Sequence, residues 1–275
     1  MPTSVSEPVA AGARPPRAFA RRVAAADLPG EPTPTRPVTE ADLDGLPPVA
    51  VRYLRAMGVV GRSRAWSLRA HWVGRFRRGP DQPWMPVDAW QYNSAVEVAR
   101  LFRMRIMVAR AVPMWGWDTY RAGRGRMLGK ALGLVTVADG SGPEFDTSEL
   151  VTWLDDAVLL APAMLLDGRT AWAAASADSF EVAVTDAGRT VRAEVLLDER
   201  ARPRDVRTAD RFADLPGGPR QAPWNTPVTG WTVVDGRPRP TGGAAVWQLP
   251  DEEFRYAELT LVDLALDVPP GRRPR

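Results

Sequence analysis

Apolar and polar side chains alternate along much of this chain, in segments bounded by Gly, Pro, Asn and Asp. In residues 66–76, for example, Trp66, Leu68, Ala70 and Trp72 alternate with polar residues. A period of two is typical of strands that bury one face. The same pattern predicts strands over residues 84–93, 101–110, 117–139 (two strands around a Gly-Arg-Gly turn), 170–176, 179–186, 190–198, 203–212, 228–235, 244–249 and 254–268.

One segment breaks this alternation and predicts a central helix. Asp146 is a suitable N-cap, and Glu149, three residues later, completes a capping box. Phe145 and Leu150 are spaced for a hydrophobic staple, and Pro162 ends the helix. The apolar residues that share one helical face are Leu150, Trp153, Leu154, Ala157, Val158 and Ala161. We therefore expect one amphipathic helix that lies on a sheet.

Both ends of the chain lack such periodicity. Residues 1–39 are rich in Pro, Ala and Arg, and residues 269–275 are similar. Little apolar surface is available there to offset the entropy of ordering, so we predict disordered tails at both ends. Folded structure then covers residues 40–268 as a single curved-sheet domain. It begins with a short helix over residues 46–58, where two prolines suit the first turn and Gly58 suits the position after the last.

The order of these elements predicts the fold class. Strands follow one another through short connections, without the alternation of strand and crossover helix that a parallel sheet requires. We expect a mainly β (α+β) protein with a single curved antiparallel sheet. The sheet forms an open half-barrel, and the central helix packs on its concave face.

Composition removes several classes of function. The 275 residues contain no cysteine and one histidine, His71, so thiolate sites and most histidine-based metal sites and catalysis are excluded. The 36 basic and 33 acidic residues are interspersed along the chain, which argues against a nucleic-acid partner. No apolar segment is long enough for a transmembrane helix. We expect a cytoplasmic protein without a cofactor.

Local clusters of reactive side chains have simpler structural interpretations. The carboxylates of Glu144, Asp146 and Glu149 could perform acid–base chemistry, but helix capping already accounts for two of them. His71 lies among arginines and is expected to be an exposed strand histidine. The glycine-rich residues 123–133 lack the spacing of a phosphate-binding loop, and a hairpin turn fits them better.

The eleven tryptophans are the most informative composition feature. Most are expected in the core, but a curved sheet can also leave a cavity lined by aromatic and aliphatic side chains. The predicted ligand-binding residues are Trp90, Trp117, Tyr120, Trp153, Leu154, Trp172 and Trp247. The predicted polar rim consists of Asp118, Arg121 and Arg124.

Several segments together resemble a family of uncharacterised bacterial proteins of unknown function. They are LPPVAVRYLRAMG, WMPVDAWQYN, DTYRAGRGRMLGKALGLVTV, GPEFDTSELVTWL, PAMLL, APWNTPVTGW and AAVWQLPDEEFRY, within residues 46–268. The resemblance implies a fold similar to the LolA/LolB-type lipoprotein carriers, which hold acyl chains under a helix. It implies no activity or catalytic residue. The chain departs from the family pattern at Thr152-Trp153, where Arg-Tyr is usual, and at Leu160-Ala161-Pro162, where Trp-Phe-Pro is usual.

Three hypotheses follow from the sequence. The first is a non-enzymatic module that binds an apolar or lipid-like ligand between the central helix and the sheet. The second is a hydrolase that uses Glu144, Asp146 and Glu149. The third is a structural or interaction protein whose own side chains fill the hollow. The size and lining of any cavity beneath the helix distinguish these hypotheses.

Overall fold

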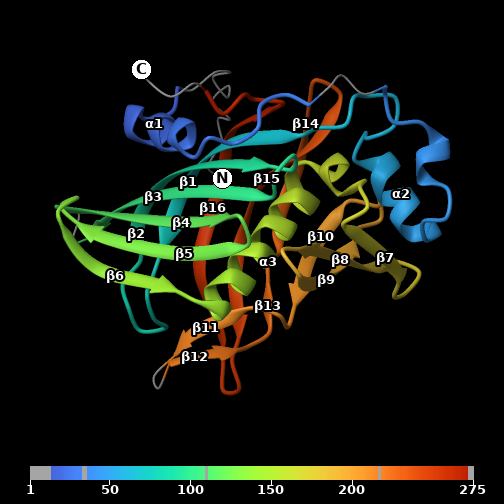
Figure 1. The fold of residues 1–275 in the computed structure, drawn as a ribbon. Helices are drawn as coiled ribbons and strands as arrows, with labels where there is room; N and C mark the ends of the chain where they lie inside the picture. The colour runs from blue at the N-terminus through green and yellow to red at the C-terminus, as the bar shows by residue number, and fades with distance from the viewer. Residues whose placement is uncertain (1–13, 33–35, 109–110, 216–217, 272–275) are drawn as a thin grey trace, which may run out of the picture.

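A single antiparallel sheet curls around one long helix in the computed structural model of this chain (Figure 1). The structure describes residues 14–32, 36–108, 111–215 and 218–271. In this part of the chain, the main sheet has the strand order β6-β5-β4-β3-β2-β1-β16-β15-β13-β10-β9-β8-β7, with β14 paired to β15. The predicted half-barrel of mainly β class is confirmed.

Most consecutive strands pair as antiparallel hairpins. The first half contains β1 (Ser67–Phe76), β2 (Met85–Ser94), β3 (Ala99–Val108), β4 (Val112–Arg121), β5 (Arg124–Ala131) and β6 (Val135–Ser141). The second half contains β7 (Thr170–Ala174), β8 (Ser179–Asp186), β9 (Arg189–Leu197), β10 (Pro203–Thr208), β13 (Trp224–Asn225), β14 (Val228–Val234), β15 (Arg237–Gln248) and β16 (Glu253–Leu266). A separate small hairpin is formed by β11 (Phe212–Leu215) and β12 (Gly218–Gln221). Because β16 pairs with both β1 and β15, it joins the two halves.

Irregularities in β16 pairing coincide with the curl of the sheet. The register shifts between His71 and Trp72 where β1 meets β16, and between Ala245 and Val246 where β15 meets β16. Such bulges bend a strand and increase its twist. Gly74 lies at the tightest approach, since a Cβ atom there would be 2.0 Å from the backbone oxygen of Glu258.

The long helix α3 (Pro143–Leu160) packs its predicted apolar face into the main core. Each of the six predicted residues from Leu150 to Ala161 is at most 2% exposed. This face meets α2 (Pro48–Ala56) and the strands β8 and β9 in one apolar cluster. The Tyr53 hydroxyl of α2 donates a 2.7 Å hydrogen bond to the backbone oxygen of Val158. A short 3₁₀ helix, η2 (Pro162–Leu165), follows, as the predicted stop at Pro162 requires.

The predicted capping box of the central helix is wrong. The helix begins at Pro143, a residue whose fixed φ suits the first helical position, and Gly142 is the N-cap. Asp146 therefore lies inside the helix. Its carboxylate accepts a 2.7 Å hydrogen bond from the backbone N–H of Gly125 in β5 and a 3.1 Å bond from Arg189 in β9. Asp146, which the sequence predicted as a local cap, thus connects the start of the helix to β5 and β9.

The predicted N-terminal tail also needs correction. Within residues 1–39 the structure shows a helix, α1 (Arg17–Ala25), whose Phe19 and Val23 are 1% and 4% exposed. These two residues lie one helical turn apart and pack in a cluster with Trp90. The sheet thus supplies the apolar contacts that an isolated helix of this length lacks. Residues 1–13 and 33–35 of the predicted tail lie outside the described residues.

The predicted strand boundaries hold only in part. Residues 117–139, predicted as two strands, contain parts of β4 and β6 and all of β5, the strand predicted over residues 203–212 ends at Thr208, and β15 begins seven residues before the predicted residue 244.

The helix predicted over residues 46–58 is α2, followed by Gly58 with a φ of +69°. It is preceded by a short 3₁₀ helix, η1 (Glu40–Leu43). At the C-terminus, Pro270 is buried, and residues 272–275 of the predicted tail lie outside the described part. None of the described helices combines the length and apolar character needed to cross a membrane.

The close approach of α3 to β5 gives a test of the fold. A Cβ atom at Gly125 would lie 2.2 Å from the backbone oxygen of Phe145, and backbone atoms cannot yield as a flexible side chain can. Gly125→Ala should therefore lower the free energy of unfolding by about 1–3 kcal/mol, measured by denaturant titration. At Gly168 a Cβ atom would meet nothing within 4 Å, which makes Gly168→Ala the matched control. Equal losses in both variants would contradict this packing.

Candidate functional site

A cavity of about 640 Å³ lies between α3 and the inner face of the sheet. Most of its wall is apolar and comes from both halves of the sheet, and its larger side chains include Trp72, Phe102, Met104, Ile106, Met114, Leu128, Trp247 and Leu259. Pockets for small organic ligands typically measure about 300–1,000 Å³ and are lined mainly by hydrophobic side chains. The cavity has the size and lining of a binding site for an apolar molecule.

The helix turns its polar face toward this cavity. The polar residues of α3 on the wall are Glu144, Ser148, Glu149, Thr152, Asp155 and Asp156. From Ser148 to Asp156 they follow helical spacing and lie on the side opposite the apolar face. The helix is therefore buried on both sides. One side fills the core, and the other carries carboxylates along the roof of the cavity.

Arg100 of β3 fixes this acidic face above the sheet. Its Nε donates a 2.7 Å hydrogen bond to Asp156, and its Nη1 donates a 3.1 Å bond to Glu149. Asn93 donates a further 3.0 Å bond to Asp156. All four side chains are buried. A buried ion pair contributes little net stability, but it strongly penalises other positions of the partners. The network therefore sets where the helix lies.

Burial changes the protonation of three cavity carboxyl groups. It raises the pKa of Glu149 to about 7, an effect that the neighbouring Asp118 charge reinforces. Burial likewise raises the pKa of Asp155 to about 8, although the Thr226 hydroxyl donates a 2.5 Å hydrogen bond to this carboxylate. The pKa of Asp118 is also raised by burial. At neutral pH Asp155 thus retains a proton that an exposed carboxyl group would lose.

Arg211, in the loop between β10 and β11, adds a positive charge to the wall. Its guanidinium lies 4.2 Å from the ring centroid of Trp224 and 5.3 Å from that of Trp247. Its Nη1 donates a 2.8 Å hydrogen bond to the hydroxyl of Tyr256. Cation–π contacts of this kind hold the guanidinium plane against the rings.

The structure places few of the predicted ligand-binding residues on the cavity wall. Of the seven, Trp247 alone is part of the lining. Trp90 and Trp117 pack with Phe19 of α1, at centroid distances of 6.4 and 6.3 Å. Their strand neighbours Gln91 and Asp118 line the cavity, so the two tryptophans lie on the outer face of the sheet.

The other four predicted residues belong to the main core. Trp153 donates a 3.0 Å hydrogen bond from its indole to the backbone oxygen of Ser94, and Leu154 beside it is fully buried. Trp172 packs against Tyr53 and Phe180 at centroid distances of 6.4 and 5.5 Å. The fourth residue is Tyr120, which is also fully buried and bonds Asp186 through its hydroxyl. These aromatic residues fill space between helix and sheet, as the core interpretation expects.

Of the predicted polar rim, Asp118 lies on the wall. Arg121 is exposed and pairs with Glu97 at 3.4 Å, and Arg124 is also exposed. The sequence interpretation missed Arg100, Asp155, Asp156 and Arg211. The spacing of Glu149, Thr152 and Asp156 on one helical face was the signal that could have indicated a second buried side.

The carboxylates proposed for hydrolysis do not converge. Glu144 and Glu149 line the cavity, whereas Asp146 is bound to Gly125 and Arg189. Glu149 is engaged by Arg100. Within the described residues, no group of three or more His, Cys, Asp or Glu side chains is arranged to hold a metal ion.

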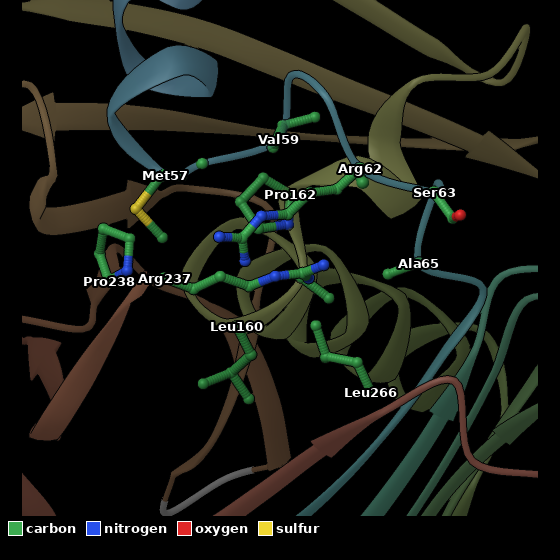
Figure 2. A pocket seen from close by; sticks show the side chains of 13 residues that line it. Met57, Val59, Arg62, Ser63, Ala65, Leu160, Pro162, Arg237, Pro238 and Leu266 are labelled. Carbon is green, nitrogen blue, oxygen red and sulfur yellow. The ribbon is translucent and has the colours of Figure 1, made fainter. Parts of the chain in front are cut away.

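A second, much smaller hollow lies between the end of α2 and the end of α3 (Figure 2). Its volume is about 30 Å³, which is enough for one or two water molecules. The side chains of Arg62 and Arg237 extend across it. Burial lowers the pKa of Arg237, and the Arg62 charge adds to the effect. This hollow is too small for an organic ligand, so the large cavity is the candidate site.

The raised pKa of Asp155 makes stability depend on pH. Because the folded-state pKa of about 8 lies above the ordinary 3.8, the stabilisation is fully present at low pH and is lost as the pH rises through about 8. The free energy of unfolding of the wild type should therefore fall between about pH 5 and 8. In Asp155→Asn the fall should be smaller, by up to about 1.4 kcal/mol per pH unit, in denaturant titrations. The exposed Asp251→Asn is the matched control, and parallel profiles for Asp155→Asn and wild type would contradict the prediction.

Three solved structures share a distant likeness with the chain. A LolA superfamily protein from Nitrosomonas europaea is 13% identical, with a TM-score of 0.42 over 78% of this chain and 91% of that one. A domain described as outer membrane lipoprotein-sorting, from Vibrio parahaemolyticus, is 12% identical, with a TM-score of 0.42 over 73% and 85%. A DUF1329 family protein from Desulfovibrio piger is 13% identical, with a TM-score of 0.44 over 85% and 95%. At this level of similarity these structures say nothing about ligand or reaction.

Sequence comparison gives a firmer assignment. No curated protein matches the chain. A family model matches residues 36–259, which include α2, α3, the cavity wall and the acidic roof. The expected membership of a family of unknown function is thereby confirmed: the chain belongs to DUF6544, a family of unknown function.

Proposed function

We propose that this protein binds an apolar or lipid-like ligand in the cavity between α3 and the concave face of the sheet, without catalysing a reaction. The observation that supports the proposal is the cavity itself, about 640 Å³ of space with a mainly apolar wall. Transfer of apolar surface from water to such a wall is favourable by about 25 cal/mol per Å². An empty apolar hollow of this size also forgoes the dispersion contacts that a bound chain would supply.

The cavity favours binding over the two alternatives. A structural protein with a filled core would place its own side chains in this space, as it does on the other side of α3. The hydrolase hypothesis needs Glu144, Asp146 and Glu149 to act together, whereas Asp146 bonds two strands and Glu149 is held by Arg100. The polar groups of the roof instead resemble the few placed polar groups that orient a ligand in an apolar pocket.

Binding can be tested with palmitate as the probe and isothermal titration calorimetry as the measurement. Ala245 lies on the cavity wall, so Ala245→Phe should fill part of the space and weaken palmitate binding by roughly tenfold or more. Ala173 is exposed on β7 and outside the cavity lining, so Ala173→Phe is the control for an added aromatic side chain. It should bind palmitate as the wild type does.

Native mass spectrometry after mild purification gives an independent readout. We expect the wild type to retain a co-purifying apolar molecule that Ala245→Phe retains less. The proposal would be contradicted if the wild type carried no such molecule and gave no binding heat with palmitate. Equal affinity in Ala245→Phe and wild type would place any binding elsewhere on the protein.

A further inference from the structure

We infer that Arg211 receives an anionic head group, a carboxylate or a phosphate monoester, so that the ligand of this cavity is an anionic amphiphile. The inference rests on the proposed function and adds the chemistry of the ligand's polar end. It depends on the position of Arg211 on the cavity wall against aromatic rings, and on a nitrogen of that side chain that lacks a partner among the described residues.

Arg211 is held by aromatic residues from three strands. Trp224 of β13 and Trp247 of β15 lie under the guanidinium, and Tyr256 of β16 accepts a hydrogen bond from Nη1. The indole N–H of Trp224 donates a 3.1 Å bond to the same Tyr256 hydroxyl. The guanidinium is thus oriented before any ligand arrives. A pre-oriented planar fork loses little side-chain entropy when it binds a carboxylate or a phosphate.

The Nε–H of Arg211 has no hydrogen-bond partner among the described residues, although the atom is buried. Leaving a buried charged donor unsatisfied costs more than the net gain from an ordinary hydrogen bond. The described ion pairs on the cavity wall involve Arg100 and not Arg211. An anion from outside would supply the missing acceptor.

Of the other arginines of the wall, Arg100 and Arg77 already have partners, and Arg78 is exposed to solvent. Arg100 bonds Glu149 and Asp156. Arg77 donates to the backbone oxygens of Arg255 and Pro80. Arg211 differs because its one described hydrogen bond goes to a neutral hydroxyl. It therefore remains available for a charge-assisted bond, which is about twice as strong as a neutral one.

The carboxyl groups of the cavity do not cancel the preference of Arg211 for an anionic head group. Asp118, Glu149 and Asp155 act on Arg211 at longer range, and burial raises the pKa of each. Asp155, whose pKa is raised to about 8, keeps its proton at neutral pH, so it adds no negative charge and can donate a hydrogen bond to an anion. The opposite preference, for a cationic amphiphile bound by ionised carboxylates, is the main competing outcome of the test.

The test compares four probes that share one alkyl chain: palmitate, hexadecyl phosphate, hexadecanol and hexadecylamine. We expect at least one of the two anions to bind the wild type about tenfold or more tightly than hexadecanol, measured by calorimetry below the micelle concentration. Arg211→Gln should remove that difference by weakening binding of the anions far more than binding of hexadecanol. Arg211→Lys keeps the positive charge but loses the planar pair of N–H donors. It should therefore retain part of the affinity difference between the anions and hexadecanol. Arg220→Gln, an exposed position on β12, is the control and should behave as the wild type.

The results separate the inference from the function on which it rests. Equal binding of the anions and hexadecanol to the wild type would overturn the head-group assignment while supporting an apolar site, and this comparison needs no variant to fold. Tighter binding of hexadecylamine, or equal loss of hexadecanol and anion binding in a folded Arg211→Gln, would also overturn it. Binding of none of the four probes would overturn the proposed function itself. Acetate and inorganic phosphate should bind at least tenfold more weakly than the amphiphiles, and equal affinity would show a free-anion site instead.

Discussion

The contact between Arg100 and the two carboxylates of α3 determines what this fold can do. An apolar helix against an apolar sheet would collapse until side chains filled the space between them, as they do on the core side. On the cavity side, Glu149 and Asp156 meet a buried arginine instead. If the helix moved away from Arg100, it would leave buried charges without partners, which is far more costly than the pair is stabilising. The contact thus fixes the helix at a defined height above the strands.

The two sides of α3 therefore have different surroundings. Toward α2, β8 and β9 it presents Leu150, Leu154 and Val158 to a closed core, and the Tyr53 hydroxyl secures this side through the Val158 carbonyl. Toward β3 and β16 it presents polar groups to a hollow lined by apolar side chains. Rigid anchoring on the first side is what permits open space on the second, because the helix needs no packing there to hold its position. A preformed site of this kind spares a ligand the cost of opening it.

Local patterns predicted most of the fold. Period-two alternation located most strands of both halves, and helical spacing located the core face of α3, because each signal depends on neighbouring residues alone. The pattern merged β5 with β6 and missed the hairpin of β11 and β12. The capping box failed because Asp146 and Glu149 have stronger long-range partners in Gly125, Arg189 and Arg100. No local pattern could report those partners.

The binding-site prediction failed for a related reason. Alternation shows that Trp90 and Trp117 share a face of the sheet, but not which face is concave. On β2–β4 both faces are covered, the outer one by α1, so tryptophan is no guide to the cavity side. The helix α1 itself was missed because Phe19 and Val23 find their apolar partners only in these distant strands.

Methionine methyl groups give the most direct test of a ligand between helix and sheet. Met104, Met114 and Met127 line the cavity, whereas Met164 is buried in the main core. With methyl-labelled methionine and palmitate, nuclear Overhauser effects between the alkyl chain and the methyl groups of the three cavity methionines should appear, and none to Met164. Contacts of the chain to none of the three, with palmitate bound, would contradict the account.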